Sequence, residues 1–315
     1  HTDDENAERA HLKYQTEVIP PVRKAGDRLD RKYLECPSRG FLDEGRWGVY
    51  DRDCSLSAKL FREENVALGV DEEECIIEYG HLTGSMTVEW EGETLTLPAL
   101  AKYSEVADRT VREKAWRLAS QRRLEDREAL EDLFDKMRVL REKMAANAGF
   151  PDFRAFRHLE YGRLDYEPAD CMGLHQSIED HVGPLLARMQ TTRKESFGLD
   201  HLRPWDMAAD PLGRPAFEPF KDPAGQVRVA ASLLEKVSPL FADDLRWMEA
   251  EGLLDLETRP HKRQGGFMET FEDRRVPFIF ANSGTTHRDV DTLVHEWGHA
   301  AHALLSRGLE PGSYR

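Results

Sequence analysis

Residues 289–302 read DVDTLVHEWGHAAH and contain the motif HExxH. His295 and His299 are four residues apart, so in a helix they lie on the same face. Val290, Leu293 and Trp297 recur at helical spacing and give that helix an apolar stripe. The pattern predicts a largely buried helix that carries two imidazoles side by side.

Two histidines one helical turn apart can bind a metal ion that prefers nitrogen and oxygen ligands. Both rings can bind one Zn²⁺ ion at Zn–N distances of about 2.0–2.1 Å. Glu296 lies about 100° further round the helix, where its carboxylate can act as general base for an attacking water. Because buried imidazole and carboxylate groups cost free energy unless they are paired or ligating, this pattern favours one zinc ion per active site.

The residues around the motif predict the limits of the helix. Thr286 and Asp289 have the spacing of a capping box, and Gly308 is placed to end the helix. His302 continues the histidine face but lies two turns from His295, so we expect it beside the site rather than as a ligand. We expect His287, just before the helix, to be a loop residue, with a substrate contact as the alternative.

A change from helical to alternating periodicity precedes this helix. Residues 266–271 and 276–281 are predicted as two strands joined by residues 272–275, so a small β-sheet should lie beside the HExxH helix. Pro277 has no backbone N–H to donate to a neighbouring strand, so we expect it on an edge strand. Gly265, Gly266 and Phe267 are candidate substrate-binding residues because glycine permits close backbone approach, although a simple turn explains the glycines equally well.

The remainder of the sequence is predicted to be mainly helical. Alternation over residues 86–97, with a turn at Glu91-Gly92, predicts a β-hairpin. Prolines should kink or break two helices, at Pro20-Pro21 and at Pro184. A break is also expected near Gly69 in a helix over 55–79, and a long loop over 199–224. We divide the sequence into residues 1–150, a helical region with the hairpin, and residues 151–315, a catalytic region that ends in the HExxH helix.

The composition limits the partners that the chain can have. The net charge is −15 and 33% of residues are charged, which disfavours binding to nucleic acid and to anionic membranes. The sequence contains no run of 18 or more apolar residues, which is the length that a membrane-spanning helix needs. The four cysteines contain no CxxC pair, so we expect reduced thiols and a cytoplasmic location, with a Cys36–Cys54 bridge left open.

Several segments together resemble the oligoendopeptidase F and thimet oligopeptidase family. They are Gly265–Phe267, Arg275–Asn282, Gly284-Thr285, Asp289-Val290 and Leu293–His302, with Leu199–Asp206 and Asp210–Gly213 upstream. The form HExGHxxH is much more selective than HExxH alone. The resemblance implies a mainly α, two-lobed, zincin-like metallopeptidase with a deep channel, one zinc ion, short peptides as substrates and a cytoplasmic location.

One departure from the family concerns the ligand set. The resemblance implies that a glutamate on a later helix is the third zinc ligand. Only 16 residues follow His299 in this sequence. We therefore expect the catalytic region to be incomplete at its C-terminus, with a further segment supplying that ligand. Glu310 is the one carboxylate after the motif and is a weaker substitute.

Three functions remain open from the sequence. The first is a zinc-dependent endopeptidase that hydrolyses short peptides, with His295 and His299 as ligands and Glu296 as general base. The second is a zinc exopeptidase resembling a carboxypeptidase. The third is a non-catalytic, peptide-binding fragment of such an enzyme.

Overall fold

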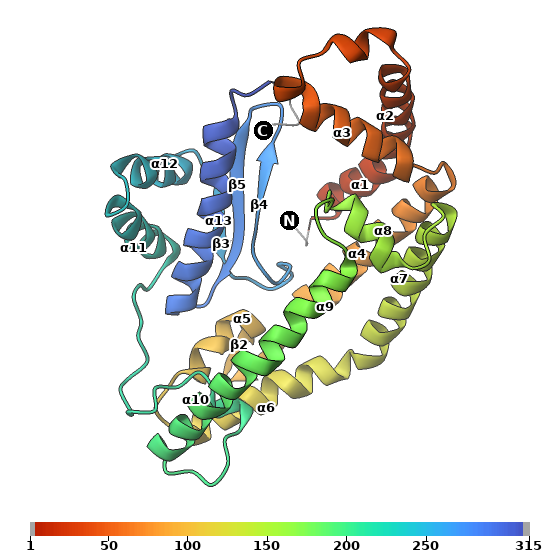
Figure 1. Ribbon diagram of the computed structural model, residues 1–315. Coiled ribbons are helices and arrows are strands. Elements are labelled where there is room, and N and C mark those ends of the chain that lie inside the picture. The colour runs from red at the N-terminus through yellow and green to blue at the C-terminus, as the bar shows by residue number, and fades with distance from the viewer. Residues whose placement is uncertain (1–3, 311–315) are drawn as a thin grey trace. The chain divides into compact units, whose positions relative to one another are not determined.

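The computed structural model describes residues 4–310 and is mainly helical, which confirms the predicted class (Figure 1). The chain forms two compact units. Unit 1 comprises the residues up to Tyr79 together with Glu128–Met189, and unit 2 comprises Gly80–Arg127 together with the residues from Gln190 onward. Each unit therefore combines segments from both sides of residue 150. The expected division at residue 150 describes the order of features along the sequence and does not correspond to these two units.

Unit 1 is built of helices. Their packing buries a small apolar cluster of Ala145, Ala148 and Phe156, which Leu60, Phe150 and Phe153 surround. The α-helices are α1 (Glu5–Lys13), α2 (Ile19–Leu34), α3 (Glu44–Leu60), most of α4 (Glu64–Gly84), α7 (Arg127–Asn147), α8 (Phe153–Glu160), α9 (Pro168–Ser177) and the first half of α10 (Gly183–Ser196).

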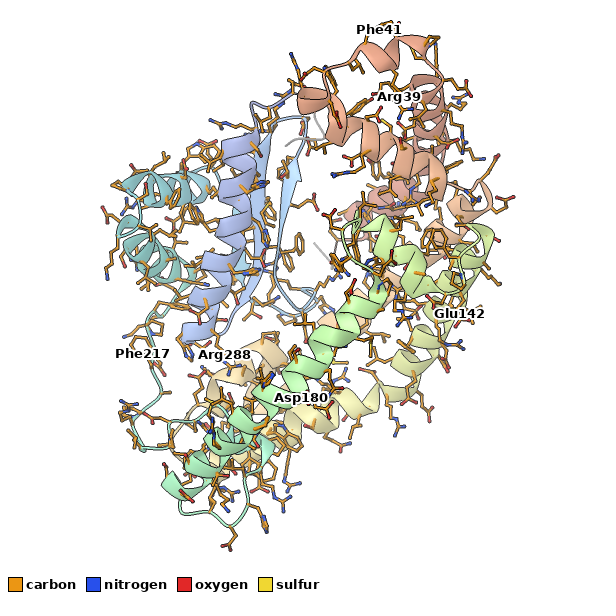
Figure 2. The ribbon with its side chains drawn as sticks, in the orientation of Figure 1. Arg39, Phe41, Glu142, Asp180, Phe217 and Arg288 are labelled. Atoms are coloured by element: carbon orange, nitrogen blue, oxygen red, sulfur yellow. The ribbon has the colours of Figure 1, made fainter. Side chains whose placement is uncertain are left out.

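Both predicted proline interruptions are π-helical turns. Tyr14–Val18 joins α1 to α2, and Ile178–Val182 joins α9 to α10. Ile19 donates its backbone N–H to Tyr14 O, and Gly183 donates to Ile178 O, which closes each wider turn immediately before the proline. A proline has no N–H and its ring collides with the carbonyl four residues earlier, so the helix widens locally instead of stopping. Asp180, which lies in the second turn, is labelled in Figure 2.

The predicted break near Gly69 is wrong. Helix α3 ends at Leu60 and α4 runs through Gly69 without interruption. A Cβ at Gly69 would lie 2.6 Å from Arg23 Nη1, so the glycine makes room for a side chain from α2. The residue serves helix packing and does not end the helix.

Unit 2 contains both sheets. Strands β1 (Thr87–Trp90) and β2 (Glu93–Thr96) form the predicted hairpin, in which Trp90 pairs with Glu93. Glu91 and Gly92 both have positive φ, as a two-residue type I′ turn requires. The helices of this unit are α5 (Leu97–Leu100), α6 (Arg109–Glu125), α11 (Pro223–Glu235), α12 (Pro239–Ala250) and α13 (His287–Ser306).

The second sheet has three strands in the order β3-β5-β4. Strands β4 (Phe267–Phe271) and β5 (Val276–Ser283) are the predicted antiparallel pair, whereas β3 (Leu254–Glu257), parallel to β5, was not predicted. The placement of Pro277 on an edge strand is wrong, because β5 is central. Its pairing with β3 begins only at Leu254–Ile279, so Pro277 faces Thr270 of β4 alone and breaks no ladder bond to β3.

Helix α13 lies between this sheet and the helix pair α11–α12 (Figure 1). One core holds them together, and its most deeply buried members include Ile279 of β5, Leu293 of α13 and Leu245 of α12. The same core contains Trp297, whose ring lies 4.8 Å from that of Phe241. The helix that carries the histidines is thus held by contacts with both the sheet and the α11–α12 pair.

The long loop between α10 and α11 is ordered by a buried carboxylate. Asp206, in the short 3₁₀ turn Pro204–Asp206, is fully buried and accepts two hydrogen bonds of 2.9 Å from Arg109. Arg112 contacts the same carboxylate at 3.2 Å, and the Arg203 N–H donates to it at 2.9 Å. Arg193 donates to the Asp206 carbonyl, so the loop is held to both α6 and α10.

The described residues contain no helix that is both long and apolar enough to cross a membrane. All four cysteines are unpaired, so the open Cys36–Cys54 bridge does not form: Cys36 is exposed and Cys54 is buried.

Replacing Asp206 with asparagine tests the carboxylate. The substitution Asp206→Asn leaves the buried Arg112 without its counter-charge, so we expect unit 2 to lose on the order of 3 kcal/mol of unfolding free energy. Asp210→Asn, in the same loop, keeps a side-chain oxygen for the Leu212 N–H and removes the charge that pairs with the exposed Arg214, so its effect should be much smaller. Urea denaturation of both variants measures the difference, and equal losses would contradict the role given to Asp206.

The same carboxylate predicts a pH dependence. Burial acts to raise the pKa of Asp206, but the hydrogen bonds from Arg109, Arg203 and Arg112 outweigh it and hold the pKa below its ordinary value. A depressed carboxyl pKa stabilises the fold above the unfolded value of about 3.9 and loses that effect as pH falls through the folded value. The stability difference between the parent and Asp206→Asn should therefore shrink below about pH 4, as thermal unfolding across pH would record.

Candidate metal centre

Helix α13 begins at the predicted cap. The Asp289 carboxylate accepts hydrogen bonds from the Thr286 N–H at 2.7 Å, the Thr286 hydroxyl at 2.9 Å and the Gly284 N–H at 3.1 Å. A carboxylate in the first turn also interacts favourably with the helix dipole. These bonds fix the direction in which the helix leaves strand β5; its first turn is marked by Arg288 in Figure 2.

One face of α13 is buried and the opposite face is exposed. The sequence led us to expect a largely buried helix, but Val294 and Leu304 are only half-buried, and His295, His299 and His302 are exposed. The buried apolar residues of the helix are Val290, Leu293, Trp297, Ala300 and Ala301. Because these face the core, the three histidines face outward.

His295 and His299 lie side by side on the exposed face. Their ring centroids are 5.0 Å apart and the ring planes meet at 84°. A tetrahedral ion with Zn–N bonds of about 2.0–2.1 Å would hold two imidazole centroids roughly 5 Å apart. The spacing of the two rings therefore fits a zinc ion bound by both.

A third protein ligand is not assembled within residues 4–310. No group of three or more His, Cys, Asp or Glu side chains in that range is arranged to hold a metal ion. Glu310 forms an ion pair with Arg275 at 3.1 Å, so it does not join the histidines. The donor set of this part of the chain is two imidazoles.

Glu296 is the buried carboxylate of the motif. Only 9% of the residue is exposed, and no hydrogen bond or ion pair engages its carboxylate among the described residues. The carboxylate oxygens are not among the enclosed side-chain atoms that lack a partner, so they reach solvent although most of the residue is buried. A carboxylate in this state, adjacent to His295 in sequence, suits a group that meets water or a substrate.

A small pocket of about 150 Å³ adjoins the histidines. Helix α13 contributes His299, His302 and Ala303, Arg307 follows it as the C-cap, and the β4–β5 hairpin contributes the rest of the lining: Met268, Thr270, Glu272 and Arg275. Its volume is below that of ordinary small-molecule sites and is sufficient for one side chain. His302 thus lies beside the histidine pair, as its spacing led us to expect.

Of the predicted substrate-binding residues, Gly266 makes its close approach to the protein itself. A Cβ at this position would lie 3.2 Å from Thr292 Cγ2 of α13 and 3.4 Å from Phe280 O. Gly265 has a φ of +103°, which favours glycine. Phe267 is 41% exposed and stacks on Phe280 at 4.9 Å. The segment therefore leads into the edge strand β4, and Gly266 contacts α13 at Thr292, about one helical turn before His295.

Two polar residues near this segment were missed by the sequence analysis. Lys262 is buried beneath the sheet, and the Asn282 side chain bonds back to the segment before β4. The alternation of Leu254, Asp255, Leu256 and Glu257 was the available signal, since it marks the strand that surrounds Lys262.

Comparison with known proteins identifies the family. Residues 102–215 and 238–314, more than half of the chain, match the model of Peptidase family M3. The chain belongs to Peptidase family M3. The match includes α13 and its histidines.

Curated relatives of this M3 chain are oligopeptidases. Oligopeptidase A of Escherichia coli K12 is 25% identical over 226 residues, which cover 56% of this chain and 33% of the relative. An oligoendopeptidase F homolog of Lactococcus lactis IL1403 is 28% identical over 141 residues, 45% of this chain and 23% of the relative. The chain thus spans a third or less of the length of these relatives.

Solved structures match over nearly the whole chain. PZ peptidase A with inhibitor 2 is 27% identical with a TM-score of 0.91, over 98% of this chain and 55% of that one. A Bacillus anthracis Ames protein described as an oligoendopeptidase F has a TM-score of 0.93 over 99% of this chain and 57% of that one, and at 24% identity it shows the fold alone. The M3 fold is therefore shared over about half of the solved chains.

A glycine at the start of the metal helix offers a stability test. A Cβ at Gly284 would lie 2.8 Å from Pro98 O, so Gly284→Ala must displace backbone and should cost about 1–3 kcal/mol. Gly298→Ala, inside α13, meets nothing within 4 Å and should raise stability by up to about 1 kcal/mol. Thermal unfolding of both variants checks the opposite signs; a neutral Gly284→Ala would contradict the contact.

Proposed function

We propose that this M3 chain carries the metal helix of a zinc-dependent endopeptidase that hydrolyses short peptides. The observation that supports this most directly is the arrangement on α13, where two exposed imidazoles 5.0 Å apart stand next to Glu296, whose carboxylate has no hydrogen-bond or ion-pair partner among residues 4–310. The oligopeptidase relatives support short peptides as the substrate class. A two-lobed zincin-like arrangement and a cytoplasmic location belong to the same proposal.

His295 and His299 would hold the zinc ion, and the helix packing keeps their rings on the outer face. Zinc, when bound, supplies Lewis-acid polarisation and lowers the pKa of water. Glu296 takes the proton from the attacking water and delivers it to the departing amine. Its position next to His295 suits this role, because a carboxylate beside the metal can exchange a proton with the attacking water.

The edge strand β4 would bind the peptide backbone. Its β5-facing side is paired, and its other side has no strand partner among residues 4–310. An extended peptide adds to such an edge by main-chain hydrogen bonds, while alternate side chains enter pockets. The 150 Å³ pocket between β4 and α13 would then receive one substrate side chain.

A second candidate is a chain that binds peptide without hydrolysing it. The absence of a third ligand among residues 4–310 favours it, since zinc sites that catalyse hydrolysis have three protein ligands. Mass spectrometry of an end-blocked peptide incubated with the zinc-loaded chain separates the possibilities. Internal cuts support the endopeptidase, a requirement for a free terminus supports an exopeptidase, and an intact but bound peptide supports the second candidate.

Substitutions in the motif test the roles separately. Glu296→Gln should retain about one zinc per chain and lose roughly 10²–10⁴-fold in the hydrolysis rate, because it removes the base and leaves both imidazoles. His299→Ala should lose zinc binding itself. Metal analysis after dialysis and a quenched-peptide assay give the two readouts.

Matched controls for these variants are available in unit 2. Glu249→Gln changes an exposed carboxylate on α12, and His201→Ala changes an exposed loop histidine. Both should keep the parent's zinc content and rate. A Glu296→Gln variant with the parent's rate would refute the assignment of the base.

A further inference from the structure

Lys262 is a buried cation in the segment that leads into β4. Its side chain is 1% exposed. The ammonium donates to Asp255 O at 3.0 Å, Glu257 O at 2.8 Å and Ala281 O at 2.6 Å, and it forms an ion pair with the Asp255 carboxylate at 3.0 Å. A single side chain therefore contacts β3 and β5 together.

The ammonium lies where the ladder between these strands is irregular. Asp255 pairs with Phe280 and Glu257 pairs with Ser283, so β5 contains one residue more than β3 over this interval. Such a bulge disrupts the ladder locally and leaves backbone groups to be bonded by other donors. Lys262 provides donors to carbonyls on both sides of the bulge.

Asn282 lies within the same bulge. Its side-chain amide donates to Arg263 O at 2.8 Å and to Gly265 O at 2.9 Å. Its oxygen accepts from the Thr258 hydroxyl at 3.3 Å. The extra residue in β5 thus coincides with a side chain bonded to the backbone of the segment before β4.

Further bonds hold the other side of this segment, residues 261–266. The His261 N–H donates to Gly84 O at 2.9 Å, and the Gln264 side chain donates to Thr83 O at 2.8 Å. At its end, Gly266 lies against Thr292 of α13, three residues before His295. Segment 261–266 is therefore bonded to α4 and β5 and ends in contact with the metal helix.

We propose that Lys262 and Asn282 are positioning residues, which fix segment 261–266 so that the edge of β4 is held in register with the histidines of α13. The inference rests on the proposed peptide binding at that edge. Lys262 acts through the sheet and Asn282 through the segment's own carbonyls, so neither needs to touch the substrate. Burial lowers the pKa of Lys262, while Asp255 opposes this, and together they show how closely the ammonium is enclosed.

Three variants in the full chain test the proposal. Lys262→Met keeps an unbranched stem and removes the ammonium. Asn282→Ala removes the two bonds to the segment and leaves the buried ion pair intact, which provides a variant if Lys262→Met does not fold. Lys221→Met makes the same chemical change at an exposed site and serves as the control.

Hydrogen exchange measures the positioning directly. In Asn282→Ala and Lys262→Met, the amides of residues 261–268 should exchange roughly tenfold faster, since each lost bond lowers local protection. The amides of α13 should keep the parent's rates. Parent-like exchange at 261–268 in both variants, or acceleration spread equally over α13 and β5, would overturn the positioning role.

Peptide affinity and zinc affinity then separate this inference from the function on which it rests. The probe is a fluorescein-labelled, end-blocked octapeptide of mixed sequence, titrated by anisotropy in the Glu296→Gln background. Both variants should weaken probe binding by roughly three- to tenfold with unchanged zinc affinity, and Lys221→Met should change neither. Parent-like probe affinity alongside faster exchange would overturn the inference. A Glu296→Gln chain that binds zinc but not the probe would contradict the proposed function.

Discussion

Helix α13 packs Leu293, Trp297 and Ala300 into the core that strand β5 and the α11–α12 pair complete. Because a helix turns by about 100° per residue, this burial determines the direction of every other side chain on it. The two histidines must then point outward, and Glu296 must lie at the boundary between core and surface. The Asp289 cap adds a second constraint, since it sets where the helix starts relative to β5. The chemistry that we propose depends on this packing.

Two buried charges extend the constraint to irregular segments. Asp206 gathers backbone and arginine donors around a loop that has almost no regular structure, and Lys262 gathers carbonyls around a bulge. Each charge is enclosed by several partners of opposite polarity, which offsets the cost of removing it from water. In unit 2, these two charged side chains thus bond backbone groups in segments that lack regular backbone hydrogen bonding.

The sequence predicted the features that depend on local pattern. The cap at Thr286 and Asp289, the β4–β5 pair and the 86–97 hairpin are all encoded within a few residues, by capping chemistry, alternation or a turn signal. Strand β3 was missed because its four residues carry little signal and its partner lies more than twenty residues away. Pro277 was misplaced because strand order is decided by tertiary packing, and the burial of Lys262 becomes visible only once the sheet has formed around it. The approach of His295 to His299 follows from their spacing of four residues in one helix. The roles of these histidines as zinc ligands and of Glu296 as general base stay predictions.

The π-helical turns at Tyr14–Val18 and Ile178–Val182 have a consequence for how such helices tolerate change. Each turn contains one residue more than a regular helix would use, so the faces before and after it are out of phase by about 100°. Deleting a single residue there would let the turn close as a regular α-helix with the downstream face in place, whereas a deletion elsewhere in the helix would rotate that face by about 100°. The helices that contain Pro20 and Pro184 can therefore lose one residue at this turn without rotating the downstream face, a distinction that an alignment scored only by residue type would not register.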